Sequence, residues 1–213
     1  MEWGTQITLS TGAKAYVLKP TLNDVLMTAF KRVTQVIYPK DISLMIFYSG
    51  IKQGSKVLES GVGTGFLTAA LAWYVGNEGH IYGYEINEKY VEVARRNLEL
   101  IGLADRVTIK NKDVTQNVDE VELDAAFLDI PNPWDALPQL NKALKPSATA
   151  VIFIPTVNQI IKTTQALLKE GFIDVKVFET TLREYQPNPE ALRPKTFYVT
   201  HTGYIITARK TKQ

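Results

Sequence analysis

Hydrophobic positions from residue 55 onward follow two alternating patterns. Short runs of apolar and β-branched residues predict strands, whereas longer stretches with apolar residues at helical spacing predict helices. In the stretch after Asn87, for example, Val91, Ala94, Leu98 and Ile101 fall on one helix face. The expected strands cover residues 56–59, 81–84, 107–109, 125–129, 150–154, 175–177 and 204–207. Strands that alternate with helices in this way are typical of βαβ units on a parallel sheet.

The last two expected strands are joined without a helix, by a loop from Gln186 to Pro189 and beyond that is long enough to be functional. We therefore expect an α/β fold: a doubly wound, seven-stranded, mostly parallel sheet with an antiparallel last strand. Residues 1–50 are expected to form an N-terminal extension with two amphipathic helices, over residues 22–36 and 42–48. The main domain is expected to cover residues 51–213.

The composition narrows the chemistry. The chain of 213 residues contains no cysteine, which excludes a disulfide framework, cysteine-ligated metal sites and thiol nucleophiles. No metal site is expected. No apolar run approaches the roughly 18 residues of a membrane span, and the N-terminus lacks a basic region followed by an apolar one. We therefore expect a cytoplasmic protein without a membrane partner.

Charge is distributed unevenly along the chain: +4 over residues 1–56, −7 over residues 57–192 and +5 over residues 193–213. An acidic centre with basic ends suits an enzyme that holds a cationic cofactor centrally and a polyanion at its periphery. Solvated surface lysines would give the same pattern, so charge alone does not decide between the two interpretations.

A glycine-rich turn, Glu59-Ser60-Gly61-Val62-Gly63-Thr64-Gly65, follows the first expected strand. A dinucleotide fingerprint would place its third glycine where this chain has Phe66, and Glu59 would repel a pyrophosphate. S-adenosylmethionine meets neither objection, because it has no phosphate and carries a sulfonium and an ammonium group. Glu85 ends the second strand, where a carboxylate can accept both ribose hydroxyls, and Asp113 follows the third, placed to accept from the adenine amino group. The simpler interpretation is a tight turn with solvated acids.

A second candidate site lies at the end of the fourth expected strand. Asp129 stands there at the sheet edge where doubly wound folds bind ligands. Pro131 and Pro133 stiffen the loop beyond it, and Trp134 offers a flat face for stacking. A target base stacked there would place its exocyclic amine to donate a hydrogen bond to Asp129.

The stretch Asp129-Ile130-Pro131-Asn132-Pro133-Trp134 resembles the D-x-P-x-P-W motif of the TrmI-type tRNA adenine-N1 methyltransferases, which modify position 58 in the T-loop. It differs from the D-P-P-Y pattern of exocyclic-amine methyltransferases, because Ile130 interrupts it. Three further stretches resemble the same family: Gln35-Val36-Ile37-Tyr38-Pro39-Lys40-Asp41, Leu58 to Gly65, and Arg193-Pro194 followed by His201-Thr202-Gly203-Tyr204. Family members usually carry a small N-terminal β-domain, of which only a remnant around Lys14 to Pro20 is expected here.

The resemblance implies the Rossmann-like class I methyltransferase fold, S-adenosylmethionine as cofactor, tRNA as partner and a homotetramer. It implies methylation of adenosine 58 at N1, with adenosine 57 left open as a further target. Asp129 would be catalytic, and Tyr38 would stand near the methyl group or the target base. The implied cofactor-binding residues are Glu59, Gly61, Val62, Gly63, Thr64, Gly65, Glu85, Asp113 and Asp129. The candidate RNA-binding residues are Trp134, Arg193, Lys195, His201, Arg209 and Lys210.

Other interpretations stay open. Tyr38 has the alternative of a core tyrosine at a helix end, His201 that of a structural histidine, and the basic residues that of solvated charges. A small-molecule or protein methyltransferase, of the corrinoid-precursor or isoaspartyl type, would share the fold and the glycine turn, although the loop after Asp129 argues against it. A non-catalytic RNA-binding subunit would keep the fold and lose the cofactor residues, which are present here.

Overall fold

A computed structural model describes residues 2–212, which form two compact units divided after Phe30. The smaller unit holds an antiparallel hairpin, β1 (Thr5–Thr8) and β2 (Lys14–Val17), followed by helix α1 (Leu22–Thr28). Thr21 and Asp24 form a reciprocal capping box at the start of α1. The helix expected over residues 22–36 is thus shorter than predicted, because the chain leaves the helix at Ala29.

The larger unit is built on one seven-stranded sheet in the order β5-β4-β3-β6-β7-β11-β8. Its strands are β3 (Lys56–Ser60), β4 (His80–Tyr84), β5 (Val107–Lys110), β6 (Leu123–Leu128), β7 (Leu144–Ile154), β8 (Phe172–Glu179) and β11 (Tyr204–Lys210). Strands β3 to β7 pair in parallel, and β11 lies antiparallel between β7 and β8. This confirms the expected doubly wound sheet with an antiparallel last strand.

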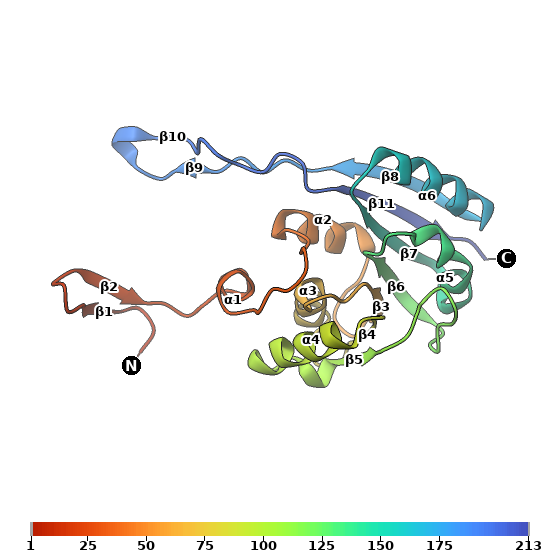
Figure 1. Cartoon of the computed structure of the whole chain (residues 1–213), viewed down its shortest axis with the longest axis horizontal. Coiled ribbons are helices and arrows are strands. Elements are labelled where there is room, and N and C mark those ends of the chain that lie inside the picture. The colour runs from red at the N-terminus through yellow and green to blue at the C-terminus, as the bar shows by residue number, and fades with distance from the viewer. Residues whose placement is uncertain (1, 213) are drawn as a thin grey trace. The chain divides into compact units, whose positions relative to one another are not determined.

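Helices cover both faces of this sheet, with α2, α3 and α4 on one face and α5 and α6 on the other (Figure 1). Their bounds are α2 (Pro39–Ser49), α3 (Phe66–Val75), α4 (Glu88–Leu100), α5 (Leu137–Ala143) and α6 (Val157–Lys169). Asn87 caps α4 by accepting from Lys89 N at 3.0 Å, and the buried residues of this helix include three of its four predicted apolar positions. Within residues 2–212, no helix is both long and apolar enough to cross a membrane.

The division into units differs from the expected boundary at residue 50. Helix α2 lies inside the predicted extension, yet it packs against β7 and β11 in the larger unit. The core of that unit lies between β6, β7 and α5, around Leu128, Leu137 and Ile152, which are all fully buried. Strand β3 lies between β4 and β6, so the connection after β3 runs toward one edge of the sheet and β6 starts the half that runs toward the other edge. The carboxyl ends of β3 and β6 therefore form the topological switch point, where ligands of such sheets bind.

The segment between β8 and β11, residues 180–203, projects from the sheet as an arm (Figure 1). Sequence analysis predicted a loop here, but the arm contains a short antiparallel ladder, β9 (Tyr185–Gln186) with β10 (Arg193–Pro194). Lys195 N donates to Glu184 O at 2.9 Å and extends the ladder by one further bond. A two-residue ladder gives little periodicity in the sequence, which is why the pattern did not predict it.

Candidate cofactor and substrate site

The glycine turn between β3 and α3 is packed tightly against the end of β6. Gly61, Gly63 and Gly65 all have positive φ, from 53° to 84°. A Cβ at Gly61 would lie 2.0 Å from the carbonyl oxygen of Asp129, and a Cβ at Gly63 would lie 3.1 Å from Thr34 Oγ1. The turn is therefore a cradle that requires glycine at Gly61, both for its left-handed backbone and for the close approach.

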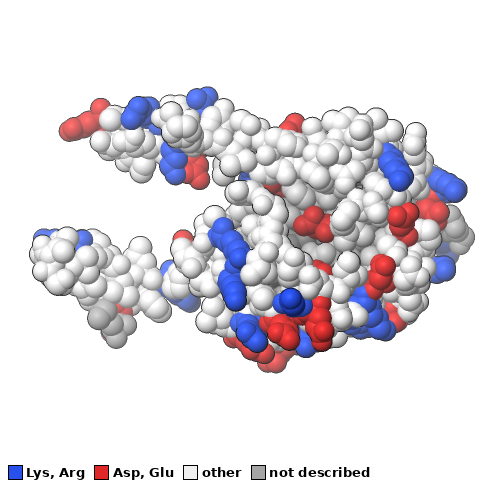
Figure 2. Space-filling model, in the orientation of Figure 1, with Lys and Arg blue, Asp and Glu red and all other residues white. Residues whose placement is uncertain are grey.

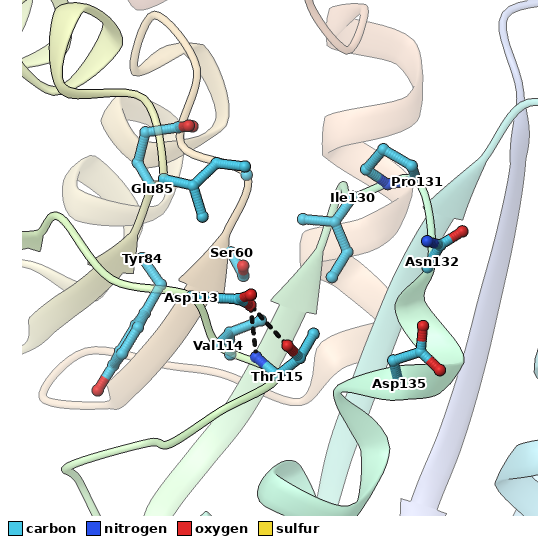
Figure 3. A pocket seen from close by; sticks show the side chains of 12 residues that line it. Ser60, Tyr84, Glu85, Asp113, Val114, Thr115, Ile130, Pro131, Asn132 and Asp135 are labelled. Carbon is cyan, nitrogen blue, oxygen red and sulfur yellow. Dashed lines mark hydrogen bonds between the residues drawn. The ribbon is translucent and has the colours of Figure 1, made fainter.

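Beside the turn, a cavity of about 300 Å³ opens at the carboxyl ends of the strands (Figure 3). We call it the Glu85 cavity. Glu85 Oε2 accepts from Gly63 N at 2.9 Å and Oε1 accepts from Asn87 N at 2.9 Å, which leaves each oxygen a further lone pair for a ligand. Asp113 lines the same cavity, and its Oδ1 accepts from Thr115 N and Oγ1 at 2.9 and 2.8 Å. Figure 3 shows Glu85 and Asp113 facing Ile130, Asn132 and Asp135 across the opening.

Glu59, on β3, carries a carboxyl group without an internal partner. The residue is 1% exposed, and among the described residues no hydrogen bond reaches either of its carboxyl oxygens. Burial raises the pKa of Glu59 to about 8, with smaller contributions from the charges of Asp129 and Glu85, and the neighbouring Thr68 offsets only part of this rise. A buried, unpaired carboxyl at the wall of a cavity is unfavourable unless a ligand supplies a donor or a positive charge.

Asp129 lies between two further cavities. A narrow one, of about 20 Å³, is bounded by the glycine turn, residues 34–37 and Glu59. The larger one, the Tyr38 cavity, has a volume of about 310 Å³. Besides Asp129, its walls are Gln35, Val36, Ile37, Tyr38, Phe153, Pro155, Val199, His201 and Thr202. Burial raises the pKa of Asp129 to about 6, with a smaller contribution from the charge of Glu85. A ligand in the narrow cavity and a second molecule in the Tyr38 cavity would thus both lie next to Asp129.

His201 stands at the foot of the arm, in the wall of the Tyr38 cavity. Its Nδ1 lies 2.7 Å from Glu179 Oε1 and its Nε2 lies 3.1 Å from the carbonyl oxygen of Pro155. Both partners only accept, so both ring nitrogens donate, which requires the protonated imidazolium. The bonds to Glu179 and then to Pro155 raise the pKa of His201 accordingly.

The other candidate RNA residues lie apart from these cavities. The ring of Trp134 is covered by Lys162 Nζ, 3.9 Å from its centroid. Arg209 donates to Ser147 O at 2.7 Å at the opposite end of β11 from the site. Lys210 donates to Leu144 O, at the same end as Arg209. Arg193 and Lys195 are on the arm, where Lys195 pairs with Glu184. Figure 2 shows Lys and Arg spread over the visible face rather than gathered in one basic patch.

Sequence reasoning missed most of the segment before α2. Residues 34–37 line both the narrow cavity and, from Gln35, the Tyr38 cavity, whereas only Tyr38 was predicted to be functional. The signal was available, because Gln35 to Asp41 was one of the stretches that resembled the family. Further lining residues of the Glu85 cavity that were not predicted include Ser60, Tyr84, Ile86, Val114, Thr115, Asn132 and Asp135.

Three carboxyl groups, Glu59, Glu85 and Asp129, therefore surround the glycine cradle. No Lys or Arg of residues 2–212 lines the Glu85 or the narrow cavity. Such walls disfavour a phosphate-containing cofactor and favour a cation, because the orphaned Glu59 carboxyl can pair with it. S-adenosylmethionine fits: its positive groups suit Glu59 and Asp129, and its ribose hydroxyls suit Glu85. Fold and site together define a class I S-adenosylmethionine-dependent methyltransferase.

Comparison with known proteins gives the family. The chain belongs to the family described as the tRNA methyltransferase complex GCD14 subunit, whose sequence model matches residues 14–199. It is 33% identical, over 98% of its length and 83% of the relative's, to the tRNA (adenine(57)-N(1)/adenine(58)-N(1))-methyltransferase TrmI of Methanocaldococcus jannaschii. The crystal structure of tRNA (m1A58) methyltransferase TrmI from Aquifex aeolicus superposes with a TM-score of 0.86 at 28% identity, covering 100% of this chain and 91% of that one.

A second solved structure is similar over 99% of this chain and 79% of its own, with a TM-score of 0.93 and 39% identity. It is described as an S-adenosylmethionine-dependent O-methyltransferase from Thermotoga maritima. All three similar proteins are described as methyltransferases, the Thermotoga protein with S-adenosylmethionine as its donor, and their descriptions differ in the acceptor atom.

Binding of the cofactor should release a proton from Glu59. In the free protein at pH 7 this carboxyl keeps its proton, because its pKa is about 8, and a nearby positive charge favours the ionised form. We expect close to one proton released per cofactor bound at pH 7, and an affinity that rises with pH up to about 8. Calorimetry in phosphate and in Tris, which differ in ionisation enthalpy, counts the protons.

The same proton affects stability of the free protein. The folded pKa of about 8 exceeds the ordinary value of 4.5, so the stabilisation from this group is complete below about pH 4.5 and is lost as the pH rises to about 8. Glu59→Gln should abolish both the proton release and this part of the pH dependence. Equal proton counts for Glu59→Gln and the natural chain would show that Glu59 is not the source.

Proposed function

We propose that this chain transfers a methyl group from S-adenosylmethionine to N1 of adenosine 58 in the T-loop of tRNA, with adenosine 57 as a candidate further target. The observation that carries the proposal is the position of Asp129, which borders both the narrow cavity beside the glycine turn and the Tyr38 cavity. At about 310 Å³, the Tyr38 cavity has room for a single base. The function named for the TrmI relative from Methanocaldococcus jannaschii supports the same reaction.

The residues of the chain act mainly by alignment and electrostatics. When bound, the cofactor supplies an electrophilic methyl group to N1, whose lone pair needs no prior deprotonation. Asp129 accepts a hydrogen bond from the exocyclic amine of adenine and offsets the positive charge that the ring acquires. Tyr38 forms part of the cavity wall and presents an aromatic ring to an unstacked base. Glu59 and Glu85 would bind the methyl donor and so fix its position relative to Asp129.

The direct test is to incubate the purified chain with unmodified tRNA and labelled S-adenosylmethionine, and to identify the methylated nucleoside by mass spectrometry. We expect 1-methyladenosine. A matched transcript with guanosine at position 58 should lose the product, or retain only the part formed at position 57. A product methylated on the exocyclic amine would contradict the N1 assignment, and no incorporation into tRNA would contradict the substrate.

A second candidate, methylation of a hydroxyl group, is favoured by the description of the Thermotoga maritima structure. The same mass spectra separate the two functions, because a methylated ribose or small-molecule hydroxyl differs in fragmentation from a methylated base. Asp129 argues for the base, since a carboxylate that accepts from an amine supports a reaction that creates positive charge.

Arg193 provides a test of how tRNA is bound. The arm borders the Tyr38 cavity through Val199, His201 and Thr202, and Arg193 lies farther along the same arm, in β10, where it can contact phosphates away from the target base. Arg193→Gln should reduce the slope of log affinity against log salt by about one. Arg209→Gln is the matched control, because Arg209 lies at the opposite end of β11. Equal slopes for both variants and the natural chain would assign Arg193 to solvent.

The quaternary structure and the compartment are further parts of the proposal. The arm exposes large apolar side chains, with Phe197 91% and Leu192 66% exposed, and this exposure supports an oligomer in which another subunit covers them. We expect light scattering to show a tetramer. We also expect the protein to be cytoplasmic, because its proposed substrate is tRNA. A monomer at micromolar concentration would contradict the tetramer.

A further inference from the structure

A closed hydrogen-bond network joins the first turn of α2 to both ends of the arm. Its members are Lys40 and Asp41 of α2, Thr180 directly after β8, and Thr202 shortly before β11. We call these four residues the arm clamp. Asp41 Oδ1 accepts from Lys40 Nζ at 2.8 Å and from Thr180 Oγ1 at 2.5 Å, and Asp41 Oδ2 accepts from Thr202 Oγ1 at 2.7 Å.

Lys40 completes the network from the other side. Its Nζ donates to Thr202 Oγ1 at 2.7 Å, to the carbonyl oxygen of Thr180 at 2.8 Å and to Thr180 Oγ1 at 2.9 Å. Each threonine hydroxyl thus donates to Asp41 and accepts from Lys40, and the three N–H groups of Lys40 are shared among four acceptors. The side chain of Asp41 is fully buried and that of Lys40 is 10% exposed.

A buried ion pair of this kind adds little net stability compared with apolar residues, because desolvating both charges offsets their attraction. It does make one geometry strongly preferred, since any displacement of the arm leaves the buried pair with each other as partners but removes its hydrogen bonds to Thr180 and Thr202. The four residues are 139 to 162 positions apart across the contact, so the clamp is a long-range link between α2 and the arm.

The clamp adjoins the Tyr38 cavity on two sides. Tyr38 is the residue at the N-cap of α2, two positions before Lys40, and it lines one wall. Thr202 and His201, at the foot of the arm, line the same cavity. Gly203, the next residue, packs closely against Phe153, which also lines the cavity. A Cβ added at Gly203 would lie 2.4 Å from the Phe153 ring. One network therefore sets the distance between the residues that α2 and the arm contribute to the cavity.

We infer that the arm clamp is a positioning device for the acceptor: Lys40 and Asp41 hold the foot of the arm against α2 and so fix the width of the cavity that receives the target base. The inference rests on the proposed function only for the identity of that base. The clamp touches neither the glycine turn nor the Glu85 cavity, so its loss should affect tRNA and leave the cofactor unaffected.

The test compares Thr180→Val with Thr180→Ser and Thr181→Val. Thr180→Val removes one hydroxyl from the clamp without changing a residue of any cavity, Thr180→Ser restores the hydroxyl, and Thr181→Val makes the same change at the exposed neighbour. Three quantities are measured: the steady-state constants for tRNA, the dissociation constant of S-adenosylmethionine, and the rate of tryptic cleavage in the arm, after Arg183 and Lys195.

For Thr180→Val we expect kcat/KM for tRNA to fall about tenfold, mostly through KM, and tryptic cleavage of the arm to rise by a similar factor, because a hydrogen bond to a charged group is lost. Cofactor affinity should stay within about twofold. Thr180→Ser and Thr181→Val should resemble the natural chain.

Unchanged cleavage and unchanged tRNA kinetics in Thr180→Val would overturn the clamp while leaving the proposed function intact. Faster cleavage with unchanged kinetics would overturn the positioning role, because loosening the arm would then have no effect on how the base is bound. An inactive natural chain would overturn the proposed function. In that case the clamp is judged by cleavage alone, and equal cleavage in Thr180→Val and Thr181→Val overturns it.

Discussion

Asp129→Asn should lower the single-turnover rate of methyl transfer to tRNA by about 10²–10³, the scale for losing one preorganised electrostatic partner. The amide keeps the shape of the side chain but removes its negative charge, and it presents a donor to the donating amine of the base. The pKa of Asp129 is raised to about 6 in the free protein, so kcat/KM of the natural chain should rise with pH through about 6 as the carboxyl ionises. The variant should lack this rise.

Rapid-quench measurement with saturating cofactor and tRNA isolates the chemical step. Asp105→Asn is a suitable control, because Asp105 is an exposed carboxylate in the turn before β5. Cofactor affinity should change less than the rate, although Asp129 also borders the narrow cavity. An Asp129→Asn variant with the natural rate and the natural pH profile would show that the residue is structural.

Gly61→Ala should abolish cofactor binding and destabilise the fold by about 3 kcal/mol, combining the cost of a left-handed alanine with that of overpacking. The added Cβ would lie 2.0 Å from the Asp129 carbonyl oxygen, so the turn and the end of β6 must separate. Denaturant unfolding and calorimetric titration with S-adenosylmethionine measure the two effects.

Gly50→Ala separates the two causes. Gly50 ends α2 with φ 76°, close to the 84° of Gly61, but a Cβ there would meet no atom within 4 Å. It should cost only about 1 kcal/mol, for the backbone conformation alone, and bind cofactor normally. If Gly61→Ala were no more destabilised than Gly50→Ala, the close contact at the turn would not be real.

Most of the sheet could be predicted from the sequence, because each strand and each crossover helix has its own local pattern. The apolar face of α4 is one example, since burial on one side dictates residue type at fixed spacing. The glycines at 61, 63 and 65 are another, because their left-handed backbone marks a tight turn between a strand and a helix. Helix α1 was overestimated because Val33 and Val36 continue the apolar pattern outside any helix: Val33 is 45% exposed, and Val36 lines both the narrow cavity and the Tyr38 cavity. A pattern of apolar residues does not distinguish a helix from such a segment.

The parts of the site that could be predicted are those whose position follows from a single segment of sequence. Glu59, Glu85 and Asp129 each follow from their place at the end of a strand, and the structure brings all three to one cradle. Trp134 stays a predicted stacking partner for a base; Lys162 of α6 lies over one face of its ring, and nothing in the sequence near Trp134 predicts that contact. The arm clamp was missed for the same reason: Asp41 and Thr180 are 139 residues apart.

The contact between Gly61 and the Asp129 carbonyl has a thermodynamic consequence. The Asp129 amide donates to Ser60 O at 2.8 Å, and its carbonyl oxygen lies so close to Gly61 that an added Cβ would come within 2.0 Å of it. Because a packed interior does not compress, a ligand that displaces the turn also displaces Asp129. Occupancy of the two sides of Asp129 is therefore coupled, and linkage requires reciprocity: the factor by which the cofactor changes the affinity for tRNA equals the factor by which tRNA changes the affinity for the cofactor.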